Sequence, residues 1–180
     1  LGRLCSKMEN VNVHNITEAI GNDKRISPHF FNSGTPYGGA CFPRDVSAFV
    51  KFAKDKGKKA KHLFFAEEVN EMVYRDILNQ TEGFDKVGII GVSFKPDSPV
   101  TIGSPSVKLI DELKSKNKTI YIFDPLKETY LNLERDVNIC ESAQECIDKT
   151  QAVILMHPSK DLSSLNYKNN HVIDLWGVVK

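Results

Sequence analysis

Lys86–Val92, KVGIIGV, is the stretch that decides the fold, because it is a short apolar run rich in β-branched residues. Such a run is typical of a parallel strand that is buried on both faces of a sheet. A second run, Thr119–Phe123 (TIYIF), ends at Asp124. Between the two runs a helix is expected over 104–116, with Pro105 in its first turn, where proline is pre-set for a helix. This order predicts a strand, a crossover helix and a second parallel strand.

Strands and helices keep alternating to the end of the chain. Helices are expected near 126–133 and 142–149, and strands at 137–140, 152–156 and 171–175. Alternation at these spacings predicts a parallel sheet with helices on both faces. The chain is therefore predicted to be an α/β protein whose second half is a Rossmann-like parallel-sheet domain.

The first half is predicted to be all-helical. Helices are expected at 1–8, at 15–20 with Asn15 as the cap and Gly21 as the stop, at 45–56 and at 60–80. The apolar pattern of the longest helix, 60–80, is compatible with packing against a partner chain and equally with burial inside one subunit. Composition changes at Gly83, so the predicted domains are 1–82 and 83–180.

Charge and cysteine content exclude several classes of protein. The 24 Lys and Arg residues nearly balance the 23 Asp and Glu residues, for a net charge of +1, which argues against a nucleic-acid partner. The basic run at 51–61, KFAKDKGKKAK, is interpreted as a solvated helix end. The four cysteines form no CxxC pair, which favours a reducing, cytoplasmic location. Neither the cysteines nor the five histidines have the spacing of a metal site.

Hydropathy and the first residues add two expectations. No apolar stretch of about 18 residues occurs, so neither a membrane span nor a signal peptide is predicted. The chain opens with Leu1 and Gly2 inside a helical pattern, so we expect it to be a piece of a longer protein.

The segment Phe31–Asp45, FNSGTPYGGACFPRD, contains the strongest candidate for chemistry. Cys41 follows a Gly-Gly pair and precedes Pro43, which predicts a junction between a loop and a helix. Backbone amides at a helix N-terminus favour the thiolate, the nucleophilic form of cysteine. Asp45 lies one helical turn further on. A reactive thiol and an inert, buried cysteine are about equally compatible with these residues.

The first strand is not followed by a dinucleotide fingerprint. The order over 88–94 is G-I-I-G-V-S-F rather than G-x-G-x-x-G, and a strand end, Asp124, stands where a ribose-binding acid is expected. Binding of NAD by this domain alone is therefore disfavoured. A ligand crevice at the carboxyl ends of the strands is still expected, and Lys95 lies there. It is either a cation for a phosphate or an ordinary surface lysine.

The chain resembles the UDP-glucose/GDP-mannose dehydrogenase family in five segments: RISPHFFNSGTPYGGACFPRD (25–45), EEVNE (67–71), KVGIIGVSFKPDSP (86–99), SPSVKLIDEL (104–113) and YIFDP (121–125). The resemblance covers nearly the whole chain. It is to the central, dimer-forming helical domain of the family and to its C-terminal nucleotide-sugar-binding domain. It implies that the family's N-terminal NAD-binding domain is absent from these 180 residues.

The resemblance also implies a function. Members of the family oxidise the C6 alcohol of a nucleotide sugar to a carboxylate and consume two NAD. Cys41 matches the catalytic cysteine, which captures the aldehyde as a thiohemiacetal and then carries a thioester. Asp45 matches the aspartate that positions or activates the hydrolytic water. NAD is expected to be bound mainly by the N-terminal domain, with Cys41 as this chain's own contact to it.

Substrate-binding residues carry over by position in the resemblance. They are Arg25, Phe30, Phe31, Asn32, Gly34, Gly38, Phe94 and Lys95. Those from Phe30 to Gly38 match the loop around the nucleotide sugar, and Arg25 matches an arginine that reaches the substrate of the neighbouring subunit. The helix at 60–80 matches the helix of the family's dimer interface, so a homodimer is expected.

The sequence departs from the family pattern at two places. Ile102 and Gly103 stand where the family commonly has Arg and Glu, and Trp176 follows Asp174 where an arginine is usual nearby. These departures favour an altered nucleotide-sugar pocket. They also keep open a second hypothesis, a dimeric nucleotide-sugar-binding homologue without catalysis. The intact nucleophile counts against that second hypothesis, since a module that only binds does not need one.

Overall fold

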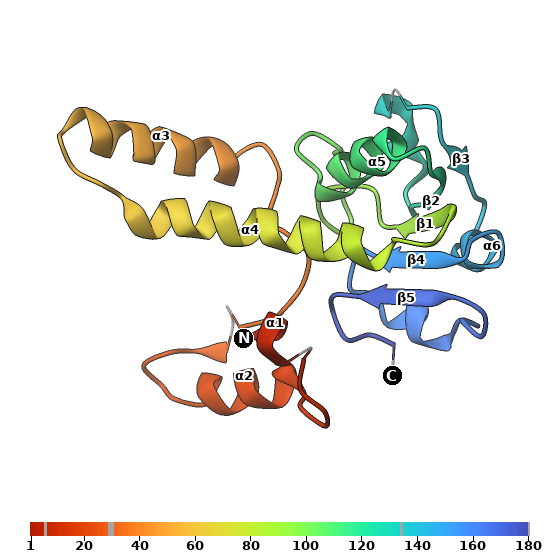
Figure 1. Cartoon of the computed structure of the whole chain (residues 1–180), viewed down its shortest axis with the longest axis horizontal. Helices are drawn as coiled ribbons and strands as arrows, with labels where there is room; N and C mark the ends of the chain where they lie inside the picture. The colour runs from red at the N-terminus through yellow and green to blue at the C-terminus, as the bar shows by residue number, and fades with distance from the viewer. Residues whose placement is uncertain (6, 29–30, 134, 180) are drawn as a thin grey trace. The chain divides into compact units, whose positions relative to one another are not determined.

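The structure is a computed structural model that describes residues 1–5, 7–28, 31–133 and 135–179. Its contacts divide the chain into two compact units, Leu1–Gly34 and Thr35–Lys180 (Figure 1). Each unit is described by itself. The predicted division into domains after residue 82 stays a prediction.

The described residues of the first unit form the helices α1 (Gly2–Cys5) and α2 (Val13–Gly21). Asn12, not Asn15, caps α2: its side-chain oxygen accepts a hydrogen bond of 2.8 Å from the His14 amide. The predicted cap was wrong because Asn12 and Asn15 are both good cap residues, and Asn12 sits where an extended backbone turns helical.

The second unit is built on a five-stranded sheet in which every strand pair is parallel (Figure 1). Its strands are β1 (Lys86–Ile90), β2 (Thr119–Phe123), β3 (Asn138–Ile139), β4 (Ala152–Leu155) and β5 (His171–Asp174). The strand order is β3-β2-β1-β4-β5, so the apolar run that decides the fold occupies the centre. This architecture confirms the predicted α/β class, with a helical segment followed by a Rossmann-like sheet.

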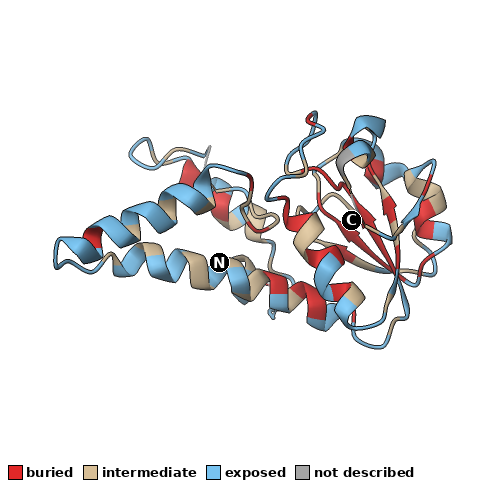
Figure 2. Ribbon diagram, turned by 90° about the horizontal axis from the view of Figure 1, so that it is seen from above, coloured by how far each residue is buried: buried red, intermediate tan, exposed pale blue. Residues whose placement is uncertain are grey.

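Both faces of the sheet are buried, because side chains alternate along each strand. Val87 and Ile89 of β1 point into one core, which also contains Leu109 of α5 (Pro105–Ser115). Ile90 points into the opposite core with Ile147 of α6 (Ala143–Asp148). Figure 2 shows that the strands are buried and that the helices covering them have exposed residues. Two 3₁₀ helices, η2 (Lys127–Asn132) and η3 (Lys160–Ser164), complete the connections, and η3 was not predicted.

A hairpin of two long helices precedes the sheet, α3 (Phe42–Asp55) and α4 (Lys61–Gln80) (Figure 1). The end of α4 packs into the core of the sheet through Tyr74, Ile77 and Leu78. The rest of the hairpin carries apolar side chains that are mostly exposed: Phe42, Phe49, Phe52, Phe64, Phe65 and Val69. No helix in the described part of the chain is long and apolar enough to cross a membrane.

Candidate functional site

Cys41 lies at the junction between the glycine-rich loop and α3, as predicted. It occupies the N-cap position, and Pro43 lies in the first turn of the helix. The Asp45 amide donates a hydrogen bond of 2.9 Å to the Cys41 carbonyl oxygen, which places the two residues one turn apart. Cys41 is exposed, whereas the three other cysteines are buried. This thiol is therefore not buried, and its reactivity stays a prediction.

The carboxylate of Asp45 is paired with its neighbour Arg44. Arg44 Nε donates to Asp45 Oδ1 at 2.9 Å, and a second guanidinium nitrogen lies 2.8 Å from the same oxygen. This hydrogen bond, with the negative charges of Asp45 and Cys41, raises the pKa of Arg44. The first turn of α3 therefore brings a thiol, a carboxylate and a fixed positive charge together in solvent.

Tyr37, four residues before Cys41, ties the glycine-rich loop to α4. Its amide donates to Asn70 Oδ1 at 2.9 Å, and Asn70 Nδ2 donates to its carbonyl oxygen at 3.0 Å. Its hydroxyl donates to Glu67, one turn earlier on α4. Burial, and after it the hydrogen bond to Glu67, raises the pKa of Tyr37 to about 12.

The next residues of the loop lie against the mouth of the sheet. The Gly39 amide donates to the Gly103 carbonyl oxygen at 2.8 Å. A Cβ atom on Gly39 would lie 2.9 Å from the ring of Phe94, so that ring packs directly on the backbone. Lys95 Nζ in turn lies 5.4 Å from the centre of the Phe94 ring. The structure therefore places Phe94 against the loop that carries Gly38 and Cys41, with Lys95 beside the Phe94 ring, and the role of these residues in one site stays a prediction.

The mouth of the sheet contains a residue that the sequence did not indicate, His157. The strand order reverses between β1 and β4, which is where open α/β sheets bind ligands. His157 follows β4, its Nε2 donates to the Ser93 carbonyl oxygen at 2.9 Å, and its ring packs on Gly91. Trp176 follows β5 and donates to the Met156 carbonyl oxygen at 3.0 Å. In the sequence, the signal for these two positions is that each comes shortly after a predicted strand, at its carboxyl end.

Asp124 is not a ribose ligand, because its carboxylate is used inside the protein. Oδ2 accepts from the amides of Val92 and Ser93 at 2.8 and 3.0 Å, and Oδ1 accepts from the Leu126 amide at 3.1 Å. The residue is only 2% exposed. The carboxylate oxygens of Asp124 are therefore occupied by the protein's own backbone amides.

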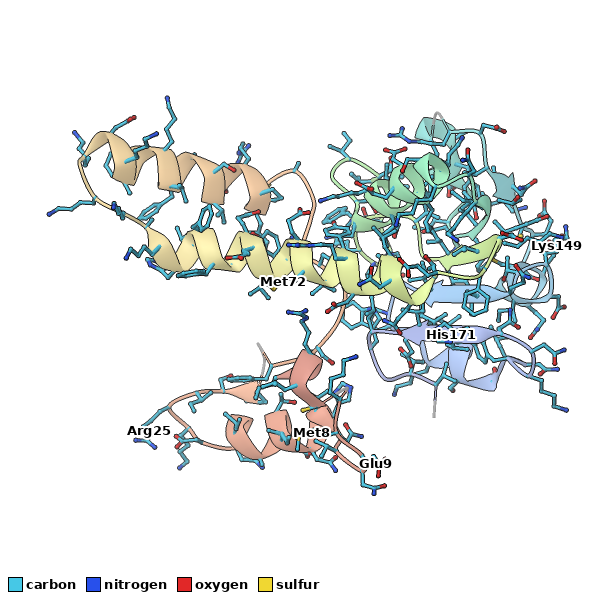
Figure 3. All side chains as sticks on the ribbon, in the orientation of Figure 1. Met8, Glu9, Arg25, Met72, Lys149 and His171 are labelled. Carbon is cyan, nitrogen blue, oxygen red and sulfur yellow. The ribbon has the colours of Figure 1, made fainter. Side chains whose placement is uncertain are left out.

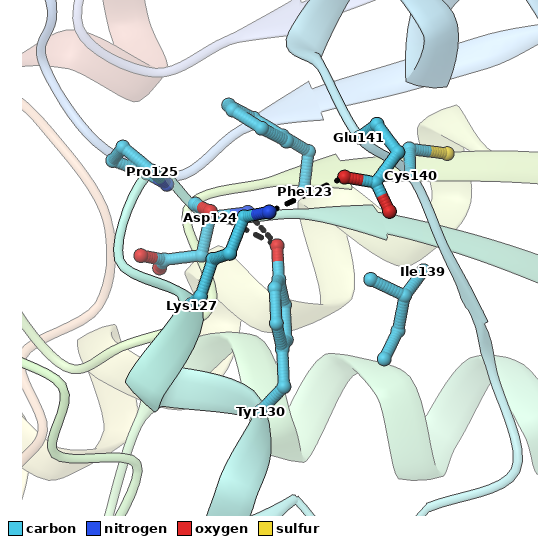
Figure 4. A pocket seen from close by; sticks show the side chains of 8 residues that line it. All are labelled: Phe123, Asp124, Pro125, Lys127, Tyr130, Ile139, Cys140 and Glu141. Carbon is cyan, nitrogen blue, oxygen red and sulfur yellow. Dashed lines mark hydrogen bonds and ion pairs between the residues drawn. The ribbon is translucent and has the colours of Figure 1, made fainter.

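A hollow of about 280 Å³ lies beside Asp124 (Figure 4). Its floor is formed by Phe123, Tyr130 and Ile139, and the ion pair of Lys127 and Glu141 spans it at 3.5 Å. It lies at the ends of β2 and β3, away from the reversal of strand order. Within the described ranges, no group of three or more His, Cys, Asp or Glu side chains could hold a metal ion.

The remaining predicted residues lie in the first unit. Arg25 is exposed and pairs with Asp23 at 2.6 Å, and it projects from the loop after α2 (Figure 3). That hydrogen bond raises the pKa of Arg25 and lowers the pKa of Asp23. Phe31, Asn32 and Gly34 belong to the same unit, and Phe30 lies outside the described residues. The role of these residues in substrate binding stays a prediction.

Comparisons with known proteins match the chain in two segments. Residues 1–72 match the central domain of the UDP-glucose/GDP-mannose dehydrogenase family, and residues 88–180 match its UDP binding domain. UDP-glucose 6-dehydrogenase YwqF of Bacillus subtilis is 26% identical over 170 residues, which are 90% of this chain and 38% of that protein. UDP-glucose 6-dehydrogenase AglM of Haloferax volcanii is 27% identical over 173 residues, which are 92% of this chain and 40% of that protein.

Solved structures agree with this assignment. A UDP-glucose dehydrogenase from the hyperthermophilic archaeon Pyrobaculum islandicum superposes with a TM-score of 0.89 at 29% identity, over 98% of this chain and 43% of that one. A GDP-mannose dehydrogenase from Pseudomonas aeruginosa shares the fold, with a TM-score of 0.73 at 21% identity over 94% of this chain and 43% of that one. The chain spans about 40% of the length of the curated relatives it matches. Because the two family models match most of its residues, the chain belongs to the UDP-glucose/GDP-mannose dehydrogenase family.

Proposed function

We propose that this chain is the thiol-bearing and nucleotide-sugar-binding part of an NAD-dependent nucleotide-sugar 6-dehydrogenase, acting on UDP-glucose or a related sugar. One observation carries the proposal. The exposed thiol of Cys41 stands at the end of a loop whose Gly39 is hydrogen-bonded to Gly103 and packs on the Phe94 ring at the mouth of the parallel sheet. Family membership supports it, because the matched domains are named for UDP binding and for this dehydrogenase family.

In the proposed reaction the C6 alcohol first loses a hydride and a proton and becomes an aldehyde. The Cys41 thiolate adds to the aldehyde carbon, which forms a C–S bond and a thiohemiacetal. Loss of a second hydride and of the hydroxyl proton leaves a thioester, and water then cleaves the C–S bond to give the carboxylate, a proton and the free thiol. A covalent intermediate of this kind keeps the aldehyde from escaping. NAD supplies the two hydride acceptors.

Asp45 is proposed to position the hydrolytic water. It lies one turn from Cys41 on α3, and its exposed carboxylate is oriented by Arg44. The described residues do not form a dinucleotide cradle, so NAD is proposed to bind outside them, with Cys41 as the point of contact. The 180-residue chain is not expected to turn over on its own.

The nucleotide sugar is proposed to lie in the mouth of the sheet. Lys95, exposed beside Phe94, offers a cation for a phosphate, and the bare backbone of Gly38 and Gly39 lets the loop approach a ligand closely. Phe31, Asn32 and Gly34 are proposed to continue this loop around the substrate. Arg25 is proposed to reach the substrate of a second subunit.

The protein is proposed to be a homodimer that works in the cytoplasm, in the supply of sugar acids for polysaccharide biosynthesis. The exposed phenylalanines of α3 and α4 support the dimer, since monomers rarely leave so many large apolar side chains together in solvent. The α3–α4 hairpin is the proposed interface.

The test uses Cys41→Ser in the protein that carries these domains together with an NAD-binding domain. The sugar acid formed from UDP-glucose, measured directly by anion-exchange chromatography, should fall by on the order of 10³-fold, because the covalent intermediate is lost. Calorimetry should show UDP binding to the 180-residue chain unchanged by the same substitution. Acid formation at the parent rate would show that Cys41 has no covalent role.

A second candidate function is a dimeric nucleotide-sugar-binding homologue without catalysis. Ile102 and Gly103 favour it, because they replace the usual Arg and Glu, and the Ile102 side chain is 70% exposed at the site. Two results together would support this candidate. The parent chain would bind UDP, and the protein that also carries an NAD-binding domain would form no sugar acid from a panel of UDP and GDP sugars. Acid formation from any member of the panel would exclude it.

A further inference from the structure

The loop that carries Cys41 is held from two sides by groups outside it. Only Gly38, Gly39 and Ala40 separate Tyr37 from Cys41. Whatever fixes the backbone of Tyr37 and Gly39 therefore fixes where the thiol stands. α4 holds Tyr37, and the loop before α5 holds Gly39.

On the α4 side, Asn70 uses both polar atoms of its side chain. Oδ1 accepts from the Tyr37 amide at 2.9 Å, and Nδ2 donates to the Tyr37 carbonyl oxygen at 3.0 Å. An amide side chain that pairs with both backbone groups of one residue imitates a neighbouring strand. It fixes the orientation of the peptide as well as its distance.

On the sheet side, the backbones of Gly38 and Gly39 lie so close to the backbone of Gly103 that only glycine fits at 38 and 103. Gly103 has a φ of +68°, and a Cβ atom there would lie 2.7 Å from the Gly39 carbonyl oxygen. A Cβ atom on Gly38 would lie 2.3 Å from the Gly103 carbonyl oxygen. The Gly39–Gly103 hydrogen bond closes this contact at 2.8 Å. A larger residue at 103 would therefore push the two loops apart.

α4 and the loop before α5, which hold the two ends of this segment, are attached to the same core. Glu71, next to Asn70 on α4, forms an ion pair of 2.5 Å with Lys108 of α5, and Ile77 of α4 is fully buried in the core of the sheet. α4 and the loop before α5 are thus fixed to the same core, and the loop of Cys41 spans between them.

We propose that Asn70 and Gly103 are positioning residues, which together set the Cys41 thiol against the mouth of the sheet. The proposal rests on the proposed function in one respect: it takes the C6 carbon of the bound sugar as the atom that the thiol must reach. Neither residue touches the reacting atoms. Loss of either contact should leave nucleotide binding at the mouth in place while it disconnects the thiol from the bound sugar.

The test compares Asn70→Asp with Asn79→Asp, which makes the same change at an exposed position of α4. The aspartate at 70 replaces the Nδ2 donor by an oxygen that repels the Tyr37 carbonyl. Hydrogen exchange of the Tyr37 and Gly39 amides in the 180-residue chain should become at least about tenfold faster in Asn70→Asp, which corresponds to one lost hydrogen bond. Asn79→Asp should exchange as the parent does.

A second measurement follows the thiol. UDP-glucose should slow the alkylation of Cys41 by iodoacetamide in the parent, and this shielding should be reduced at least about fivefold in Asn70→Asp, while the Kd for UDP stays within about threefold. A merely structural role for Asn70 would change the Kd and the shielding together. If UDP-glucose does not shield Cys41 in the parent, the proposed function fails, and the exchange of the two amides still decides the proposal about positioning.

Gly103→Ala and Gly57→Ala form a second pair. Both glycines have a φ of +68°, but no atom lies within 4 Å of a Cβ on Gly57. The two substitutions therefore share the backbone strain, and only Gly103→Ala adds the clash with Gly39. We expect fast exchange of the Gly39 amide in Gly103→Ala alone. Parent-like exchange of the Tyr37 and Gly39 amides in both Asn70→Asp and Gly103→Ala would overturn the proposal.

Discussion

At the scale of single residues, Asp124 shows how one side chain can join several loops. Its carboxylate accepts hydrogen bonds from the amides of Val92, Ser93 and Leu126 and from the Thr129 hydroxyl. These bonds connect the end of β1 to the end of β2. Without the carboxylate, the donors would lack an acceptor in a region that solvent hardly reaches. The acid at the end of β2 thus builds the mouth of the sheet instead of binding a ribose.

We predict that Asp124→Asn destabilises the protein by about 2–4 kcal/mol, because the amide NH₂ would face backbone donors that stay buried without an acceptor. The free energy of unfolding from urea denaturation measures this loss. The control is Asp161→Asn, which makes the same change at an exposed position in the first turn of η3. Equal stability of the two variants would contradict the account of Asp124.

The sequence could indicate Cys41 and Asp45, because their chemistry and spacing are local. It could not indicate Asn70 or Gly103, since their roles depend on partners 33 and 64 residues away along the chain. An asparagine inside a helix and a glycine in a loop are ordinary in a sequence. Only the fold brings them to the same short loop.

At the scale of elements, the N-terminus of α5 is where the sheet and its first crossover helix are joined. Ser104 caps α5 by accepting from the Ser106 amide at 3.1 Å, and its hydroxyl donates to the Val92 carbonyl oxygen at 2.6 Å. Ser142 caps α6 by accepting from the Glu145 amide at 3.1 Å, and it is exposed. Both serines therefore cap a helix, but Ser104 also donates a hydrogen bond to the carbonyl oxygen of Val92.

We predict that Ser104→Ala costs about 2–3 kcal/mol of stability, against about 1 kcal/mol for Ser142→Ala. The first loses a cap and leaves a buried carbonyl oxygen without its partner, and the second loses only a cap. Thermal and urea unfolding of the two variants check the difference. The explanation fails if Ser142→Ala is the more damaging change.

Element boundaries show which local signals decide an element. The strand 119–123 was predicted to the residue, but β1 ends at Ile90 because Gly91 takes a φ of +93°. α3 begins at Phe42 rather than at Asp45, because Pro43 already starts the first turn. The segment near 126–133 is a 3₁₀ helix, held by Asp124 at its start. Periodicity predicts the elements, and single residues such as Gly91 and Pro43 decide where they begin or end.

At the scale of the whole molecule, half-buried tyrosines couple stability to alkaline pH. Burial is the main cause that raises the pKa of Tyr37, Tyr130 and Tyr167 from the ordinary value of 10 to about 12. The folded state therefore favours the neutral phenol. This contribution to stability is fully present below pH 10 and is lost as the pH rises from 10 through 12, because the unfolded chain releases its protons first.

We predict that the free energy of unfolding falls between pH 10 and pH 12, and that it falls less steeply in Tyr167→Phe. Tyr167 donates to the Leu162 carbonyl oxygen at 2.8 Å, so the variant is also less stable at pH 8. Urea unfolding at a series of pH values, with tyrosinate absorbance in parallel, measures both effects. Parallel curves for parent and variant would show that Tyr167 does not contribute to the slope.

The last prediction concerns association of whole molecules through the α3–α4 hairpin. Phe64 and Phe65 are 63% and 56% exposed on α4, and a phenylalanine that becomes buried in an interface removes a large apolar surface from water. Phe64→Asp should therefore weaken the proposed dimer roughly 30-fold, which corresponds to about 2 kcal/mol at an interface hot spot. Sedimentation velocity over a range of concentrations measures the shift. Leu131→Asp, at a position of η2 that is 81% exposed, introduces the same charge away from the hairpin and should sediment as the parent does. A parent chain that stays monomeric at every concentration, or an unchanged dimer in Phe64→Asp, would place the interface elsewhere.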